Sequence, residues 1–476
     1  MNSEIHYRTA FIISDLHIGA GKTDDCDLEL EQSFIEFLKY LYSKNDKIEL
    51  IINGDFLDFA QAPVLGDCDL RSESTGGIPL CFTERQSLKK LDSIHKAHRP
   101  IFDALRDYLA RNGGNRLIIL PGNHDADLFW PNVREEFIAL VGGSSAVRDN
   151  LTFHLESAYY PPGQPTVRIE HGHQYDPCNW FKVYGIEHWS ADNPPIFKDH
   201  LGHERLLECV GTRFLNKFLN RIDEDYPFID NVKPFSKFLE LFGMSALQPG
   251  QGPFKAAIAI WSMLRFLSHS LLHYQTDLLK IGESVDSKVS HPLQLFLEEM
   301  SDDQRALLTK MLRENGFEIF CPLIMYVENE ENAELCSEFF ADHLDWLNDF
   351  EEKVPFLLSL SGSRGTLTLG KGFLTDETAL LANAAEKLIE SQALDLVVMG
   401  HTHVPVDRSK KINYINTGSW TRHYRFKEGE YSRPWSILKE DSYKWFPYDL
   451  KYAKVHFGQV TSVQLLTFRE RYYDEN

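Results

Sequence analysis

Short apolar runs that end in Asp, Asn or His beside glycine recur along this sequence of 476 residues. In the last of them, residues 394–399 lead into Gly400-His401-Thr402-His403. The apolar run predicts a buried strand, and the loop that follows it can direct both histidines into the crevice above a sheet. Such a histidine pair, taken alone, is about as often an ordinary hydrogen-bonded pair as a metal site. The interpretation therefore depends on four similar motifs upstream.

The four upstream motifs also follow predicted strands, which we expect at residues 8–14, 48–52, 116–120 and 166–170. The polar residues at their ends are Asp15 and His17, Asp55, Asn123, and His171. Adjacent glycines permit tight turns and close approach of the backbone. In α/β proteins, ligands bind at strand ends, so we expect these side chains to converge at one edge of a sheet.

Helical and strand-like segments alternate over most of the chain, which indicates a layered α/β architecture. Helices are predicted at residues 28–42, about 84–110, and 377–391, and further strands near 151–155, 412–420, 436–439 and 453–468. The alternation stops between about 180 and 375, where the pattern is mostly helical. We predict one domain composed of residues 1–180 and 376–476, interrupted by a helical insertion or lid at residues 181–375.

The strand-end residues form a donor set suited to metal ions: Asp15, His17, Asp55, Asn123, His171, His401 and His403. Seven oxygen and nitrogen donors are too many for one tetrahedral ion. They suit two five- or six-coordinate ions that share a carboxylate. A set of His, Asp and Asn without Cys accepts Mn, Fe, Zn or Co, and manganese is our prediction.

As an ordered set, the motifs resemble those of the calcineurin-like metallophosphoesterases. They are Asp15-Leu16-His17, Gly54-Asp55-Phe56-Leu57-Asp58, Gly122-Asn123-His124-Asp125, His171-Gly172 and Gly400-His401-Thr402-His403. The resemblance implies a four-layer α/β/β/α sandwich with two central sheets. It also implies hydrolysis of phosphate esters by in-line attack of a metal-bridging hydroxide.

The resemblance also assigns roles by position. It gives Asp15, His17 and His403 to the first ion, Asn123, His171 and His401 to the second, and Asp55 to both. His124 would protonate the leaving oxygen or stabilise the transition state, and Asp125 would orient His124. Asp58 and Asp125 can equally be capping or supporting residues. His173 is expected to support the site or face the substrate, and Asp176 to close the loop after His171.

The position of the insertion, between His171 and His401, resembles the branch of UDP-2,3-diacylglucosamine pyrophosphatases, which carry a helical cap there. Two features depart from that branch: it has Arg where this chain has His124, and its cap is much smaller. The apolar helical pattern within 254–272 either packs the insertion onto itself or forms a groove for an acyl chain. The expected substrate is a small or lipid-linked phosphodiester or pyrophosphate.

Two other classes of function remain open from the motifs. The same five motifs serve nucleases that act on single-stranded or damaged DNA or RNA ends, but a net charge of −21 disfavours binding to duplex nucleic acid. A non-catalytic scaffold is disfavoured because every ligand position is filled.

The sequence also bears on where the protein acts. The seven cysteines are scattered, with no CxxC pair, which fits a reducing compartment. No secretion signal or membrane-spanning segment is expected, so we predict a cytoplasmic protein, with peripheral membrane contact and oligomeric state left open.

Overall fold

The computed structural model describes residues 9–20, 26–44, 47–62, 82–110, 115–176, 179–181, 185–198, 377–425, 446–457 and 461–469, with positions 202, 204–207, 209, 212 and 232–233. Most of the predicted insertion and the strand-like run at 436–439 therefore lie outside the described residues. Near the start of the insertion, β6 (Ile196–Lys198) and β7 (Glu204–Leu206) form an antiparallel pair instead of a helix. Pro194 and Pro195 precede β6, and proline is excluded from a helix interior because it lacks an N–H.

The larger of two central sheets has six strands in the order β14-β13-β1-β2-β3-β4. Its strands are β1 (Thr9–Ile13), β2 (Ile48–Asn53), β3 (Arg116–Leu120), β4 (Leu151–Phe153), β13 (Lys451–His456) and β14 (Ser462–Thr467). Strands β1 to β4 run parallel, whereas β13 pairs antiparallel with β1, and β14 pairs antiparallel with β13. The carboxyl ends of β1, β2 and β3 therefore share one edge of the sheet.

The smaller sheet has four strands in the order β10-β11-β9-β5. Its strands are β5 (Val167–Ile169), β9 (Leu396–Met399), β10 (Val406–Asp407) and β11 (Tyr414–Asn416). Strands β5, β9 and β11 are parallel, and β10 pairs antiparallel with β11. A separate short pair joins β12 (Tyr424–Arg425) to β8 (Val232–Lys233).

The two sheets pack face to face, and the alternation of side chains along their strands shows how. Ala10 and Ile12 of β1 lie in one buried cluster with Ile169 of β5 and Val398 of β9. Phe11, between them in sequence, points to the opposite face and belongs to a second cluster under the helices. Because successive side chains of a strand face opposite sides, β1, β2, β3 and β13 each contribute to both cores.

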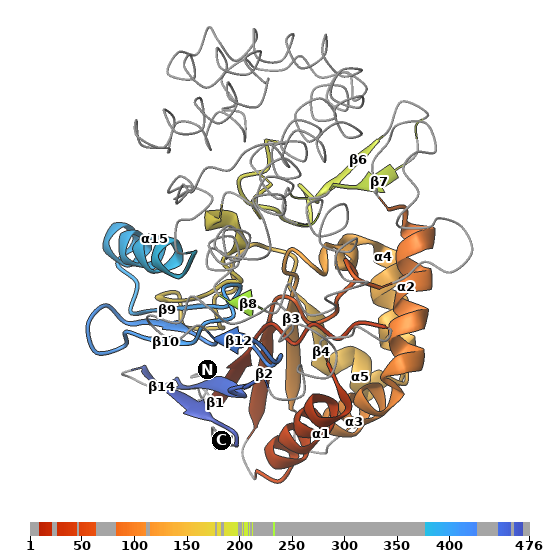
Figure 1. The fold of residues 1–476 in the computed structure, drawn as a ribbon, viewed down its shortest axis with the longest axis horizontal. Helices are drawn as coiled ribbons and strands as arrows, with labels where there is room; N and C mark the ends of the chain where they lie inside the picture. The colour runs from red at the N-terminus through yellow and green to blue at the C-terminus, as the bar shows by residue number, and fades with distance from the viewer. Residues whose placement is uncertain are drawn as a thin grey trace, which may run out of the picture.

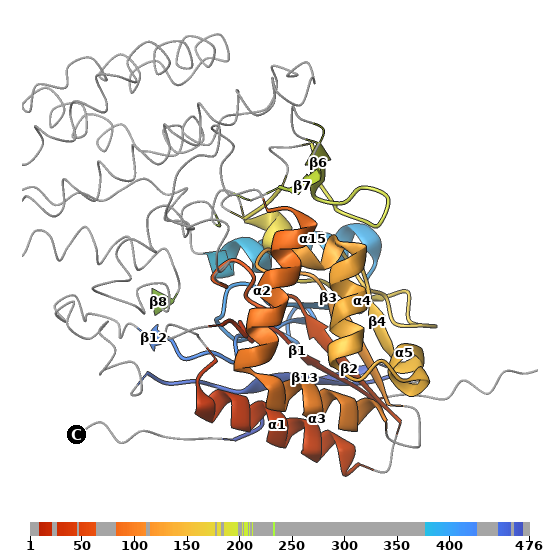
Figure 2. The same cartoon turned by 90° about the vertical axis from the view of Figure 1, so that its right-hand side faces the viewer.

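Helices cover the outer face of each sheet (Figures 1 and 2). The larger sheet carries α1 (Leu28–Tyr42), α2 (Glu84–Ala97), α3 (Arg99–Leu109), α4 (Pro131–Leu140) and α5 (Ser145–Asn150). On the smaller sheet, Leu381 of α15 (Glu377–Gln392) packs with Val397 and Met399 of β9. The result is the expected α/β/β/α sandwich. Within the described part of the chain, no helix combines the length and apolar character needed to cross a membrane.

The predicted helix at 84–110 is two helices, α2 and α3, which meet at His98. Pro100 lies in the first turn of α3, where its missing N–H is tolerated, but it could not lie inside a continuous helix. Helix α1 has the predicted bounds, and the Asp27 carboxylate caps it by accepting from the N–H groups of Glu29 and Leu30. Helices α4 and α5 were not predicted.

Candidate metal centre

Both sheets contribute to one cluster of polar side chains at the carboxyl ends of their strands. The larger sheet supplies Asp15 and His17 after β1, Asp55 after β2 and Asn123 after β3, and the smaller supplies His171 after β5 and His401 and His403 after β9. Six of these seven residues are buried, and His401 is partly buried. The structure therefore brings all seven predicted ligands to the boundary between the two sheets.

Most of these residues have an uncommon backbone conformation. Positive φ angles between 44° and 72° occur at Asp15, His17, Asp55, His401 and His403. For residues other than glycine, such angles are disfavoured and persist only when the surroundings hold them. Hydrogen bonds between loops do so here: the Asp15 N–H donates to the Gly54 carbonyl at 3.1 Å and the His17 N–H to the Asp55 carbonyl at 3.0 Å.

Two glycines allow the ligands to approach one another. A Cβ on Gly400 would lie 2.5 Å from Ser14 Oγ and 2.6 Å from Asp15 Oδ2. Gly54 has a φ of +86°, and a Cβ there would overlap the His171 ring. These motif glycines are thus explained by space, because the neighbouring ligand occupies the volume that a side chain would fill.

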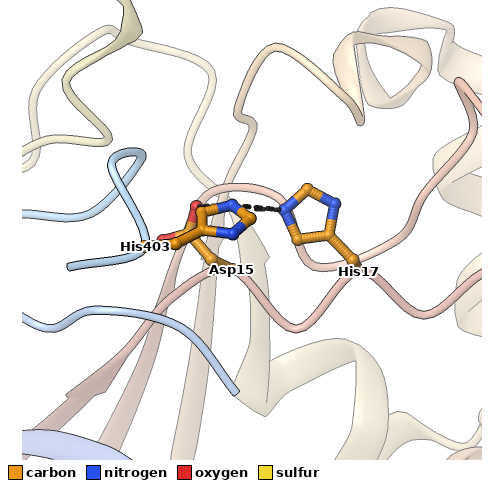
Figure 3. Close-up of side chains that lie close together, drawn as sticks. All are labelled: Asp15, His17 and His403. Atoms are coloured by element: carbon orange, nitrogen blue, oxygen red, sulfur yellow. Dashed lines mark hydrogen bonds and ion pairs between the residues drawn. The ribbon is translucent and has the colours of Figure 1, made fainter. Parts of the chain in front are cut away.

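The first group of donors contains Asp15, His17 and His403 (Figure 3). His403 Nε2 lies 3.3 Å from Asp15 Oδ1 and 3.0 Å from His17 Nε2. Burial alone would raise the pKa of Asp15, but the hydrogen bond to His403 and the charges of His403 and His171 lower that pKa to about 2. Asp15 is therefore ionised at neutral pH.

Asp55 lies between this group and a second group that contains His171 and His401. Its Oδ2 is 3.7 Å from His17 Nε2 and 3.2 Å from His171 Nε2. Burial would raise the pKa of Asp55, but the charges of His171 and His124 hold it well below the usual value. The Asp55 carboxylate is thus an anion within reach of both groups.

The donor atoms suit a cation because the outer nitrogens of two histidines are already used. His17 Nδ1 lies 3.1 Å from Asp58 Oδ2, and His171 Nδ1 lies 2.9 Å from the Asn53 carbonyl. Since these ionised or carbonyl oxygens only accept, each Nδ1 carries a hydrogen, and each Nε2 faces Asp55 with either a proton or a lone pair. Lone pairs this close repel unless a proton or a cation lies between them, so the residues fit divalent ions.

The other two proposed donors of the second group, Asn123 and His401, are held by contacts with neighbouring side chains. Asn123 Oδ1 lies 3.3 Å from His171 Nε2. His401 Nε2 lies 2.9 Å from Asp176 Oδ2, which was expected only to close its own loop. With its Nε2 hydrogen directed to a carboxylate, the His401 ring keeps Nδ1 as its donor to a metal.

The structure gives His124 a different carboxylate partner from the expected Asp125. His124 Nδ1 contacts Asp58 Oδ1 at 3.2 Å, and its ring lies 4.7 Å from that of His17. The Asp125 carboxylate instead accepts the N–H of Phe56 at 2.8 Å and the N–H of Gly122. Asp58, and not Asp125, orients His124, because both oxygens of Asp125 hold the backbone of the loops after β2 and β3.

Burial and the charge of Asp55 raise the pKa of Asp125 to about 7. At neutral pH this carboxyl group is therefore near its titration midpoint.

His173, the remaining candidate, lies in packed surroundings. The His173 ring lies 4.3 Å from Trp189, and His173 belongs to none of the described donor groups. Burial and the charges of His171 and His401 hold the pKa of His173 well below its ordinary value.

A model of the calcineurin-like phosphoesterase family matches residues 9–242. The matched segment contains the first four motifs and ends before His401 and His403. No curated protein matches the chain. The likeness to the UDP-2,3-diacylglucosamine pyrophosphatase branch therefore stays a prediction.

Proposed function

Because the chain belongs to the calcineurin-like phosphoesterase family, we propose that it hydrolyses phosphate esters with two divalent cations at the boundary between its sheets. The position of Asp55 supports this proposal most directly. Its carboxylate shares one donor group with His17 and another with His171 and His401. A carboxylate that serves two groups is the element that a dinuclear site requires.

The proposed ligand sets follow from these groups. Asp15, His17 and His403 would hold the first ion, Asn123, His171 and His401 would hold the second, and Asp55 would be shared by both. When bound, the ions supply positive charge to phosphate oxygens and activate water as a nucleophile. Nitrogen and oxygen donors without thiolates are compatible with manganese, iron, zinc or cobalt, and manganese is the ion that we propose.

His124 is the proposed proton donor to the leaving oxygen. Its side chain is 16% exposed, whereas that of Asp58 is 1% exposed, so the imidazole can reach a substrate while its partner stays buried. Burial would raise the pKa of Asp58, but the charges and hydrogen bonds of His124 and His17 lower it below the usual value. The Asp58 anion thus keeps a hydrogen on His124 Nδ1 and leaves Nε2 to face the substrate.

The proposed substrate is a small or lipid-linked phosphodiester or pyrophosphate. The net charge of −21 supports a small substrate over a nucleic acid, because a polyanion would be repelled at long range. A cytoplasmic location and peripheral contact with membranes belong to the same proposal.

Turnover of nitrophenyl esters by metal-stripped protein tests the proposed activity. Resupplied manganese should restore hydrolysis of a nitrophenyl phosphodiester, and the matching monoester measured in parallel gives the preference. Asp55→Ala should abolish turnover and lose bound metal, because both groups lose their shared donor. Two bound ions without hydrolysis of either ester would contradict general phosphoesterase activity. Salt-sensitive binding and cleavage of single-stranded DNA would favour a nuclease.

A further inference from the structure

A chain of hydrogen bonds between polar side chains connects Asn123 to His401, two proposed ligands of the second ion. Asn123 Nδ2 donates to Asn179 Oδ1 at 3.3 Å, and Asn179 Nδ2 donates to Asp176 Oδ2 at 2.7 Å. The same Asp176 oxygen lies 2.9 Å from His401 Nε2. Asn123 and His401 belong to different sheets, so this line of contacts spans the boundary that the centre occupies.

The chemistry of Asp176 fixes the direction of every hydrogen bond in the line. An ionised carboxylate only accepts, so Asn179 must present its NH2 group to Asp176 and its oxygen to Asn123. Asn123 must then present its own NH2 group to Asn179, which leaves its Oδ1 for the cation. The reversed amide of Asn123 would direct N–H groups at a positive ion.

The same carboxylate sets the histidine on the other side. His401 donates its Nε2 hydrogen to Asp176, which leaves the Nδ1 lone pair for the ion and increases its basicity. Asp176 thus controls an amide through Asn179 and an imidazole directly.

We propose that Asp176 and Asn179 are positioning residues for the second cation, which orient Asn123 and His401 as its ligands. This inference rests on the dinuclear centre proposed above.

The buried thiol of Cys209 also contacts the Asn179 amide. Its Sγ lies 3.4 Å from Asn179 Oδ1, to which the thiol can donate. Cys209 is buried and falls within the predicted insertion. The inserted segment therefore contributes to the support of a proposed metal ligand.

The first test is the replacement Asn179→Leu, which removes both hydrogen bonds at similar volume. Manganese titrations followed by electron paramagnetic resonance count the ions and detect the magnetic coupling of a pair. We expect the affinity for the second ion to fall about 10- to 100-fold, with loss of the coupled signal and little change at the first ion. Asn132→Leu is the matched control, since Asn132 donates to a Glu84 oxygen at 2.9 Å outside the centre.

A second variant, Asp176→Asn, keeps the size of the side chain but removes the anion that sets the direction. It should also weaken the second site selectively, and the double variant should lose less affinity than the sum of the two single losses. Unchanged binding of the second ion in both variants would overturn the inference, as would equal weakening of both ions. Failure of the wild-type protein to bind two ions would instead overturn the dinuclear centre.

Discussion

At the scale of single residues, Asp58 serves two sides of the candidate site. One oxygen contacts His17 Nδ1 at 3.1 Å and the other contacts His124 Nδ1 at 3.2 Å. Asp58 therefore links a proposed ligand of the first ion to the proposed proton donor. Its loss should affect metal affinity and proton transfer together.

We expect Asp58→Asn to lower turnover about 10²- to 10⁴-fold, the usual contribution of general acid–base catalysis, and to weaken the first ion about 10- to 100-fold. The comparison is His124→Ala, which should lower turnover similarly while both ions stay bound. Steady-state rates and metal content measured on the same samples separate the two effects. If Asp58→Asn bound metal with wild-type affinity, the inference that Asp58 supports His17 as a ligand would be contradicted.

The affinity for metal should also depend on pH in a defined direction. Burial would lower the pKa of His171, but the charge of Asp55 raises it from 6.5 to about 9 in the metal-free protein. At pH 7 His171 therefore carries a proton that a cation must displace. Apparent affinity should rise up to about tenfold per pH unit from pH 7 and level off near pH 9. Calorimetry in buffers of different ionisation enthalpy counts the released protons, and binding without proton release would contradict this account.

Sequence reasoning named the residues that gather at the centre but not all of their supports. His401 and its partner Asp176 are separated by 225 positions, and no periodic pattern connects them. The available signal was the placement of Asp176 and Asn179 just after His171. Asp125 was expected to orient His124 because the two residues are neighbours in sequence. Its carboxylate instead accepts the N–H of Gly122, three residues back in its own loop, as Asp often does in turns.

At the scale of elements, strand ends determine the site, and the apolar runs predicted the strands that carry the ligands. The division of the helix at 84–110 depended on one proline, which a periodicity argument passes over. Helices α4 and α5 are short, and their buried residues belong to the core that the helices and the larger sheet share. The pattern of a single sequence gives little information on such elements.

Gly400→Ala tests whether the turn after β9 has room for any side chain. The added Cβ would meet Ser14 and Asp15 of the β1 loop, so we expect a loss of about 1–3 kcal/mol in the free energy of unfolding of the metal-free protein. Weaker binding of the first ion should accompany it. Denaturant unfolding and manganese titration measure the two effects. The control is Gly163→Ala, because Gly163 has a φ of +76° and open space around it, away from the centre. If Gly163→Ala and Gly400→Ala weakened metal binding equally, the steric argument would be contradicted.

At the scale of the whole molecule, the centre joins segments that are far apart in the chain. Asp15 and His403 share a donor group across 388 positions, because β1 and β9 end at the same boundary between sheets. Bound ions would therefore connect both sheets. The division into two flanking parts and an insertion stays a prediction, because most of the segment at 181–375 lies outside the described residues.

Metal removal should consequently lower the stability of the folded protein. Ligand linkage gives about 2.7 kcal/mol at a free metal concentration 100 times the dissociation constant. The midpoint of thermal unfolding should rise with manganese concentration in the wild type and stay constant in Asp55→Ala. A metal-independent midpoint in wild-type protein that binds two ions would contradict a connection between the sheets.

The placement of β1 between β2 and β13 has a consequence for synthesis on the ribosome. Strand β1 leaves the ribosome long before its partner β13, which begins at Lys451. Until then, one side of β1 presents unpaired backbone groups, which readily pair with other chains. The first ion's donor set likewise waits for His403. A nascent or truncated chain that ends before β13 should therefore be prone to aggregate and depend on chaperones.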